Sequence, residues 1–178
     1  WVGTSPACLR EDAAGATPCI PTAFCSYTGE ALDQKTPLLR SMAAINEQSL
    51  RLLRLFGNTT SKKVTPSVGP EQVYFLVDKE KYLKRKDLIY AGRTLFGAPP
   101  AKGQEMDDHY FGAIRERIAS YMKDVNKELW KLGVSAKKQH NEVAPAQHEL
   151  AQLYAEAKIA VDHNQLVMET LLKVAGRH

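Results

Sequence analysis

The sequence predicts an α+β fold, and two observations support this prediction. Apolar residues recur at helical spacing over three long stretches, residues 36–57, 110–132 and 153–175, and the periodicity changes to strand-like alternation within residues 64–78. Long helices combined with separated strands are typical of α+β domains. The chain has 178 residues, of which 44% are hydrophobic, and a chain of this size can bury a substantial core.

The first helix is predicted from its end signals. Thr36 is a natural N-cap, Pro37 fits the first helical position, and Gly57 follows the last apolar residue. One stripe of apolar residues at helical spacing is expected to be buried along this helix. The stripe consists of Leu38, Met42, Ile45, Leu52 and Phe56.

Two further helices are predicted later in the chain. One runs from Tyr110 to Leu132 and ends at Gly133, where a glycine is expected. The other runs from Leu153 to Ala175. Their apolar faces consist of Ile114, Ile118, Tyr121, Val125 and Leu129 in the first, and of Ala157, Val161, Val167, Met168, Leu171 and Val174 in the second.

The predicted strand places a carboxylate among apolar residues. Glu71, Val73 and Phe75 share one face of it, and we expect that face to be buried. A buried carboxylate needs a cation or a hydrogen-bond donor, because burial without one is costly. The alternative interpretation is that Glu71 is simply the exposed first residue of the strand. The pattern alone leaves both interpretations open.

Two segments are expected to be loops. The chain up to about Gln34 is rich in proline and glycine, with one short strand candidate at residues 23–27. Residues 92–103 form a second loop that is too long to be only a connector. This loop lacks the residue order of a phosphate-binding loop, and its prolines remove backbone donors that such a loop uses. No nucleotide-binding fingerprint is therefore recognised.

Composition argues against several classes of protein. No apolar run approaches the roughly 20 residues of a membrane helix, so membrane insertion is not expected. The net charge of +4 is spread along the chain, and the basic run at residues 81–86 favours a solvated face over nucleic-acid binding. The three cysteines are too few for a disulfide framework. We expect reduced thiols in a non-secreted protein of the cytoplasm or an organelle interior, with no targeting peptide visible.

Residues 140–150 carry candidate metal ligands. Glu142 and Glu149 flank a stretch that Pro145 interrupts. Mg²⁺ and Mn²⁺ prefer carboxylate oxygens, and such ligands often converge from irregular segments. His140 and His148 suggest zinc together with Glu142, but the H-E-x-x-H spacing of a zinc helix is absent. A site made of oxygen ligands is therefore the favoured hypothesis.

Several segments together point to one family. They occur in collinear order at residues 19–24, 26–33, 35–42, 92–97, 102–104, 107–112, 140–145 (His-Asn-Glu-Val-Ala-Pro) and 162–166 (Asp-His-Asn-Gln-Leu). In this number and order they resemble type III glutamine synthetases over nearly the whole chain. The resemblance implies a partial catalytic domain with an antiparallel sheet packed against long helices. It would span residues 1–178, with an N-terminal loop region (1–35) and a helix-strand core (36–178).

The resemblance also implies an activity. The family joins ammonia to glutamate at the expense of ATP, through γ-glutamyl phosphate, with Mg²⁺ or Mn²⁺ as cofactor. Carried over by motif, Glu71, Glu142 and Glu149 would be metal ligands. The second glutamate of the family's Glu-x-Glu strand falls at Val73, which supplies no ligand. Water could fill that position, and we expect weaker metal binding.

The resemblance has consequences for assembly and completeness. The family's remaining site elements, including a metal-binding histidine and substrate-binding arginines, would follow His178, so this chain alone is expected to be inactive. Family members form homo-oligomeric rings. The alternative hypothesis is a degenerate homologue that serves as a structural or interaction subunit of a larger hetero-complex, which the loss of a carboxylate at Val73 would favour.

Overall fold

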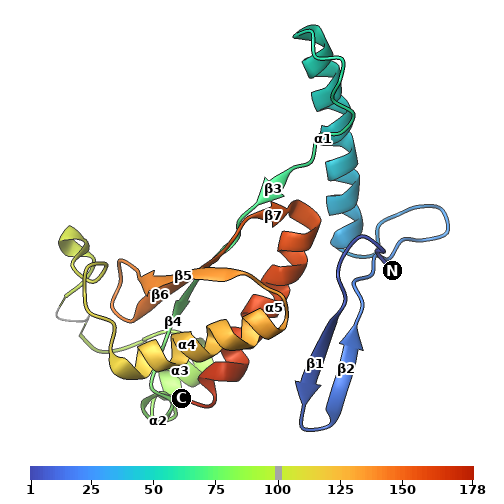
Figure 1. Ribbon diagram of the computed structural model, residues 1–178. Helices are drawn as coiled ribbons and strands as arrows, with labels where there is room; N and C mark the ends of the chain where they lie inside the picture. The colour runs from blue at the N-terminus through green and yellow to red at the C-terminus, as the bar shows by residue number, and fades with distance from the viewer. Residues whose placement is uncertain (99–101) are drawn as a thin grey trace.

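A three-stranded antiparallel sheet and two long helices make up the main body of the chain (Figure 1). The structure is a computed structural model that describes residues 1–98 and 102–178. The strands are β1 (Cys8–Asp12), β2 (Gly15–Cys19), β3 (Ser67–Val68), β4 (Glu71–Phe75), β5 (Ala136–Asn141), β6 (Gln147–Gln152) and β7 (Ala155–Glu156). The helices are α1 (Lys35–Leu55), α2 (Lys79–Tyr82), α3 (Lys86–Ala91), α4 (Glu116–Lys131) and α5 (Ala157–Ala175), with a short 3-10 helix η1 (Glu105–Asp107).

The main sheet has the order β4-β6-β5, with antiparallel neighbours. Strands β3 and β7 form a second antiparallel pair; β3 comes just before β4 in the chain, and β7 comes just before α5. Strands β1 and β2 form a separate hairpin. Long helices and antiparallel strands are thus both present, which confirms the predicted α+β architecture. The strands β5 and β6 were not predicted, because residues 140–150 were taken for an irregular segment around Pro145.

The core lies between the sheet and the helices α4 and α5. Helix α4 contributes Val125 and Leu129, and α5 contributes Val167 and Val174, all fully buried. Leu150 of β6 completes this cluster from the sheet. Six of the apolar positions predicted for these helices are therefore confirmed as core: Tyr121, Val125, Leu129, Val167, Leu171 and Val174.

The prediction of which face of β4 is buried was wrong. Val73 and Phe75 are 50% and 60% exposed, and Glu71 on the same face is exposed as well. Tyr74 packs against the core from the opposite face, because α4 and α5 cover that side of the sheet. Alternation identifies the two faces of a strand but does not say which one the helices will cover. The strand is also shorter than the predicted stretch 64–78.

Both later helices begin further along the chain than predicted. Helix α4 starts at Glu116 and not at Tyr110, because residues 108–115 form turns and extended backbone. It ends before Gly133, whose φ of 77° confirms the predicted glycine terminus. Helix α5 starts at Ala157 because the residues before it belong to β6 and to β7, where Ala155 pairs with Val68.

Helix α1 projects away from the rest of the chain (Figure 1). Its predicted buried stripe was wrong, since Ile45, Leu52 and Phe56 are 48%, 55% and 80% exposed. The predicted N-cap also differs, because the side chain of Asp33 accepts the N–H of Thr36 at 2.9 Å while the helix begins at Lys35. Helical periodicity shows that a face is apolar, and here that face is partly covered only near Leu38 and Met42, whereas its C-terminal part is exposed in the described chain.

The N-terminal segment contains a hairpin where a loop was expected. Strands β1 and β2 are joined by the two residues Ala13 and Ala14, and Gly15 takes a φ of 128° that favours glycine. Pro18 is tolerated because a two-stranded ribbon leaves edge positions without partners. The strand candidate at residues 23–27 is reduced to a single bridge between Cys25 and Ala31.

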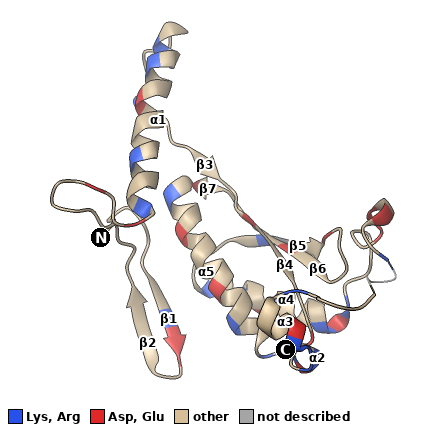
Figure 2. Ribbon diagram, turned by 180° about the vertical axis from the view of Figure 1, so that it is seen from behind, with Lys and Arg blue, Asp and Glu red and all other residues tan. Residues whose placement is uncertain are grey.

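The remaining connections agree with the sequence where they are described. The basic run at residues 81–86 is exposed, as predicted for a solvated face. Gly92 ends α3 with a φ of 66°, and the loop after it was predicted over residues 92–103, of which 99–101 lie outside the described residues. Basic and acidic residues are interspersed along α1, α4 and α5 (Figure 2). Within the described ranges, no helix has the length and apolar character required to cross a membrane.

One partly buried ion pair fixes the start of α1 to α5. Lys35 pairs with Asp162, with side chains only 10% and 24% exposed, and also donates to the carbonyl of Lys158 at 3.1 Å. We expect Lys35→Met to leave the Asp162 carboxylate without its cation and to destabilise this contact by about 2 kcal/mol. Native-state hydrogen exchange of the α1 amides would measure the change. Lys62→Met, at an exposed site, is the matched control and should have no effect.

Candidate metal site

Strands β5 and β6 bring three potential ligands to one face of the sheet. His140 on β5 lies directly opposite Glu149 on β6 in the antiparallel register, so both side chains project from the same face. Glu142 follows His140 by two residues and projects the same way, because its N–H donates to the carbonyl of Gln147 at 2.8 Å and extends the hairpin. Ligand atoms of these three residues all lie within 4.8 Å of one another.

The imidazole of His140 lies between the two carboxylates. Its Nδ1 is 3.6 Å from Oε1 of Glu142, and its Nε2 is 3.6 Å from Oε1 of Glu149. Both distances are too long for hydrogen bonds. The Glu149 residue is 8% exposed, and the Glu142 side chain is 16% exposed. Two carboxylates are thus held close together with little water around them.

Burial and nearby carboxylates both act on the pKa of Glu149. Burial raises the pKa of Glu149 above its ordinary value, and a hydrogen bond with Glu142 and the charge of Glu71 raise it further. Only His140 acts in the opposite direction. A cation between the carboxylates would remove this penalty, because it would neutralise both charges at once.

The predicted ligands are only partly brought together. Glu142 and Glu149 lie in the three-residue cluster with His140, which the sequence interpretation had set aside in favour of oxygen ligands alone. Glu71 lies outside the cluster, opposite Ala151 and exposed, although its charge acts on Glu149. Strand spacing at positions 140 and 142 was the signal that could have placed His140 beside Glu142 on one face.

The two candidate zinc histidines lie on opposite faces of the sheet. His148 precedes Glu149 on β6, so its ring points toward the helices, where it is 6% exposed and tilted against Tyr74 with ring centroids 5.9 Å apart. Burial lowers the pKa of His148. The zinc hypothesis that combined His140, His148 and Glu142 is therefore wrong in this structure.

Val73 occupies the position beside the cluster. It is the register partner of Glu149 on the third strand, so Val73, Glu149 and His140 form one row across the sheet. Its side chain is half exposed on the same face as the cluster. A longer acidic side chain at position 73 would extend beside Glu149, because directly opposed residues have Cβ atoms roughly 5 Å apart.

A loop covers the cluster from the direction of η1. The ring of Tyr110 lies 5.4 Å from that of His140, centroid to centroid, and the Asn141 side chain donates to the carbonyl of Gly112 at 2.8 Å. Burial and the charges of Glu142, Glu149 and Glu71 raise the pKa of the Tyr110 hydroxyl. The sequence interpretation missed Tyr110, because it was assigned to a helix that in fact begins at Glu116.

The donor set fits a divalent cation. Two carboxylates and one imidazole within 4.8 Å offer oxygen and nitrogen ligands that suit Mn²⁺, and with water ligands also Mg²⁺. The pKa of Glu149 is raised mainly by burial and further by the neighbouring carboxylates of Glu142 and Glu71, so a bound cation would favour its charged form. The cluster therefore has suitable ligand atoms, close enough together to bind one cation.

Comparisons with known proteins place this chain among the glutamine synthetases. The family model described as the N terminal of glutamine synthetase type III matches residues 1–41, and that described as the glutamine synthetase catalytic domain matches residues 51–178. A glutamine synthetase of Butyrivibrio fibrisolvens is 57% identical over 159 residues, which are 89% of this chain and 23% of that protein. The type-3 glutamine synthetase of Dictyostelium discoideum is 51% identical over 178 residues, which are 100% of this chain and 24% of that protein.

The fold has a counterpart among solved structures. A glutamine synthetase of Plasmodium falciparum, solved by cryo-electron microscopy, superposes with a TM-score of 0.58 at 14% identity, over 96% of this chain and 34% of that one. This similarity confirms the predicted fold, a partial glutamine synthetase catalytic domain. The chain spans about a quarter of the length of the curated relatives named above. Because the catalytic-domain match covers residues 51–178, the chain belongs to the glutamine synthetase family.

Proposed function

We propose that this chain supplies one metal-binding wall of a glutamate–ammonia ligase active site, within a longer protein that uses ATP and Mg²⁺ or Mn²⁺. The observation that supports the proposal best is the cluster of His140, Glu142 and Glu149 on one sheet face. When bound there, a divalent cation would neutralise the charge that develops on a transferring phosphoryl group.

The roles of the individual residues follow from their positions. Glu142 and Glu149 would each offer a carboxylate oxygen, and His140 would offer a ring nitrogen or hold the two carboxylates apart. Glu71 is exposed two ladder positions from the row of Val73 and Glu149, and it would face a neighbouring cation or water. Tyr110 and its loop would limit the access of water to the cluster, since the ring packs on His140.

The activity test concerns the complete protein. A γ-glutamyl transfer assay with Mn²⁺ should show turnover that Glu142→Gln reduces by about 100-fold or more, because the carboxylate is lost without a change in shape. Glu47→Gln on the exposed surface of α1 is a matched control. Full activity of the Glu142→Gln protein would contradict the proposal.

Val73 supports a second candidate function. A half-exposed valine stands in the row of the cluster, and apolar side chains on α1 such as Leu55, 84% exposed, remain uncovered in the described chain. Both features suit a degenerate homologue that serves as an interaction subunit of a larger assembly. The complete protein would then show no transfer activity with Mn²⁺, although its fold is retained.

Val73→Glu tests whether the geometry of a metal site is preserved in the row of Val73 and Glu149. We expect the added carboxylate to strengthen Mn²⁺ binding about tenfold, because it would lie beside Glu149 and complete a set of three acidic side chains. It should also lower the stability of the metal-free protein, since a further negative charge enters the cluster.

Mn²⁺ titration followed by electron paramagnetic resonance would measure the gain. Val77→Glu, beyond the end of β4 and 60% exposed, is the matched control and should leave binding unchanged. The gain should disappear when Glu142→Ala is added. A Val73→Glu protein that binds Mn²⁺ no better than its parent would contradict the metal assignment at this row.

A further inference from the structure

We propose that Cys8 and Cys19 form a modification site, at which a low-molecular-weight disulfide oxidises the two thiols to an intramolecular disulfide. The site lies at the open end of the β1–β2 hairpin, far along the sheet ladder from the turn at Ala13 and Ala14. It is separate from the metal cluster and does not depend on the proposed function. Both cysteines are free thiols in this structure.

The register places the two thiols opposite each other. Cys8 and Cys19 are direct Cα partners in the antiparallel pair β1–β2. The Cα atoms of such partners lie roughly 4.5–5.5 Å apart, which falls within the range of about 4.4–6.8 Å that a disulfide spans. Directly opposed side chains project from the same face of the ribbon. The bond can therefore form without a change in strand register.

The two thiols lie on neighbouring strands and are accessible to a small reagent. Burial raises the pKa of Cys8, and the charge and hydrogen bonding of Cys19 raise it further. The effect of Cys19 on the Cys8 pKa agrees with the register, which places the two residues directly opposite each other. Both residues are only half-buried, and they line an open cavity of about 260 Å³ between the hairpin and α5, together with Leu132, His163 and Leu166. A small reagent can therefore reach them.

The chemistry balances with a disulfide reagent as the oxidant. The Cys19 thiolate attacks one sulfur of the reagent, so that a mixed disulfide forms and one reagent thiol leaves. Cys8 then loses its proton and attacks the Cys19 sulfur. The second reagent thiol leaves. The protein is oxidised by two electrons, and one reagent disulfide is reduced to two thiols.

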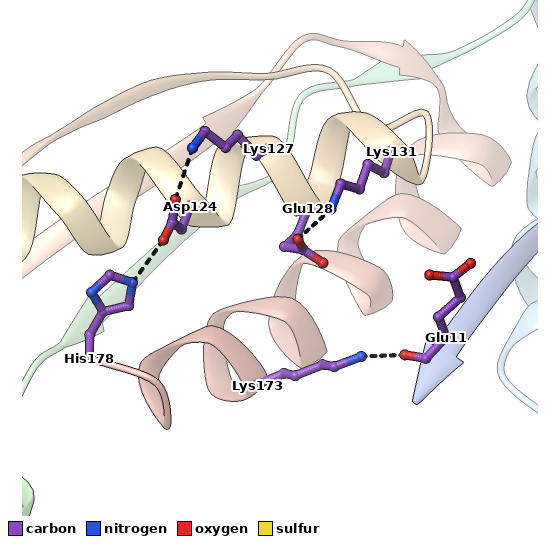
Figure 3. Close-up of polar contacts among 7 residues, drawn as sticks. All are labelled: Glu11, Asp124, Lys127, Glu128, Lys131, Lys173 and His178. Carbon is purple, nitrogen blue, oxygen red and sulfur yellow. Dashed lines mark hydrogen bonds and ion pairs between the residues drawn. The ribbon is translucent and has the colours of Figure 1, made fainter. Parts of the chain in front are cut away.

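The disulfide would add a covalent link between the two strands at the open end of the hairpin, beside the hydrogen bond that Lys158 of α5 donates to Thr4 at 2.6 Å. Toward the turn, Arg10 pairs with Glu169 of α5. Lys173 of α5 donates to the carbonyl of Glu11 at 2.6 Å, as Figure 3 shows. These contacts are exposed, and a two-stranded ribbon is marginally stable by itself. A covalent link between Cys8 and Cys19 would close the open end and restrict the hairpin to its docked form.

Peptide mapping of the complete protein tests the assignment. The protein is incubated with oxidised glutathione under native conditions, alkylated, digested with trypsin and analysed by mass spectrometry. Cleavage after Arg10 and Lys35 separates Cys8, in residues 1–10, from Cys19, in residues 11–35. We expect a disulfide-linked pair of these peptides that disappears on reduction. Hydrogen exchange of the β1 and β2 amides should slow by about tenfold on oxidation.

Matched serine variants identify the bond. Residues 11–35 also contain Cys25, which is exposed. The linked pair should persist in Cys25→Ser and should be lost in both Cys8→Ser and Cys19→Ser. A link that survives in Cys19→Ser, or separate glutathione adducts on Cys8 and Cys19 without a link, would overturn the proposal.

Discussion

Leu129→Ala is expected to destabilise the packing of α4 on α5 and the sheet by about 3 kcal/mol, because it leaves a cavity at a fully buried position. Leu129 is 0% exposed and lies in the cluster that joins both helices to β6. Its carbonyl also accepts the N–H of Val134 at 2.9 Å, which turns the chain toward β5. The loss of stability is therefore expected to affect α4, α5 and the central strand β6 together.

Native-state hydrogen exchange of the complete protein would measure this effect. The amides of α4 and α5 should exchange about 100-fold faster in Leu129→Ala than in the parent, which corresponds to the lost stability. Leu172→Ala removes the same atoms from a side chain of α5 that is 78% exposed, and it should change the free energy by less than about 0.5 kcal/mol. Equal effects of the two substitutions would show that the predicted core does not hold the helices.

The core was predictable because its helices carry their own pattern. Val125, Leu129 and Val167 recur at helical spacing, and each is buried. The same pattern failed for α1, where Ile45 and Leu52 are equally periodic but exposed. Periodicity shows that a face is apolar, and whether it is covered depends on which other element reaches it. That information lies in long-range packing and not in the local sequence.

The sheet was less predictable than the helices for a related reason. Strand β4 was recognised by alternation, but its covered face was assigned wrongly because Glu71 and Val73 lie on the side away from α4 and α5. Strands β5 and β6 were missed because their residues are polar and Pro145 lies between them. A polar strand such as β5 is stabilised by its partner in the ladder and carries little propensity of its own.

The candidate site shows what each source of information contributed. Residue types and the family resemblance singled out Glu142 and Glu149, and the structure places them in one cluster. The register of β5 against β6 added His140, which composition alone had placed with His148 in a rejected zinc site. Tyr110 became visible only when the loop before α4 was seen to fold over His140. Which residues pair across strands, and where a loop lies, can be known only once the fold is known.

Glu149→Gln is expected to act in opposite directions on stability and on metal binding. In the metal-free protein, burial raises the pKa of Glu149, and the adjacent Glu142 raises it further. A neutral, isosteric glutamine removes the repulsion and should raise the melting temperature slightly. The same change removes one carboxylate ligand from the cluster, and Mn²⁺ binding should weaken by about 100-fold.

The opposite signs separate a metal site from a structural cluster. Thermal unfolding of the complete protein would be followed without metal and at several Mn²⁺ concentrations, since a ligand stabilises the fold according to its affinity. Mn²⁺ should raise the melting temperature of the parent far more than that of Glu149→Gln, whereas Glu47→Gln on α1 should respond as the parent does.

The possible outcomes discriminate between two roles of Glu149. If Glu149→Gln lowers the metal-free stability and leaves the Mn²⁺ response intact, the carboxylate serves as a hydrogen-bonding partner of Glu142 and not as a ligand. If it raises the metal-free stability and abolishes the response, the repulsion between Glu142 and Glu149 is a cost that the fold accepts in order to hold a cation. The second outcome is the one that the geometry of His140, Glu142 and Glu149 leads us to expect.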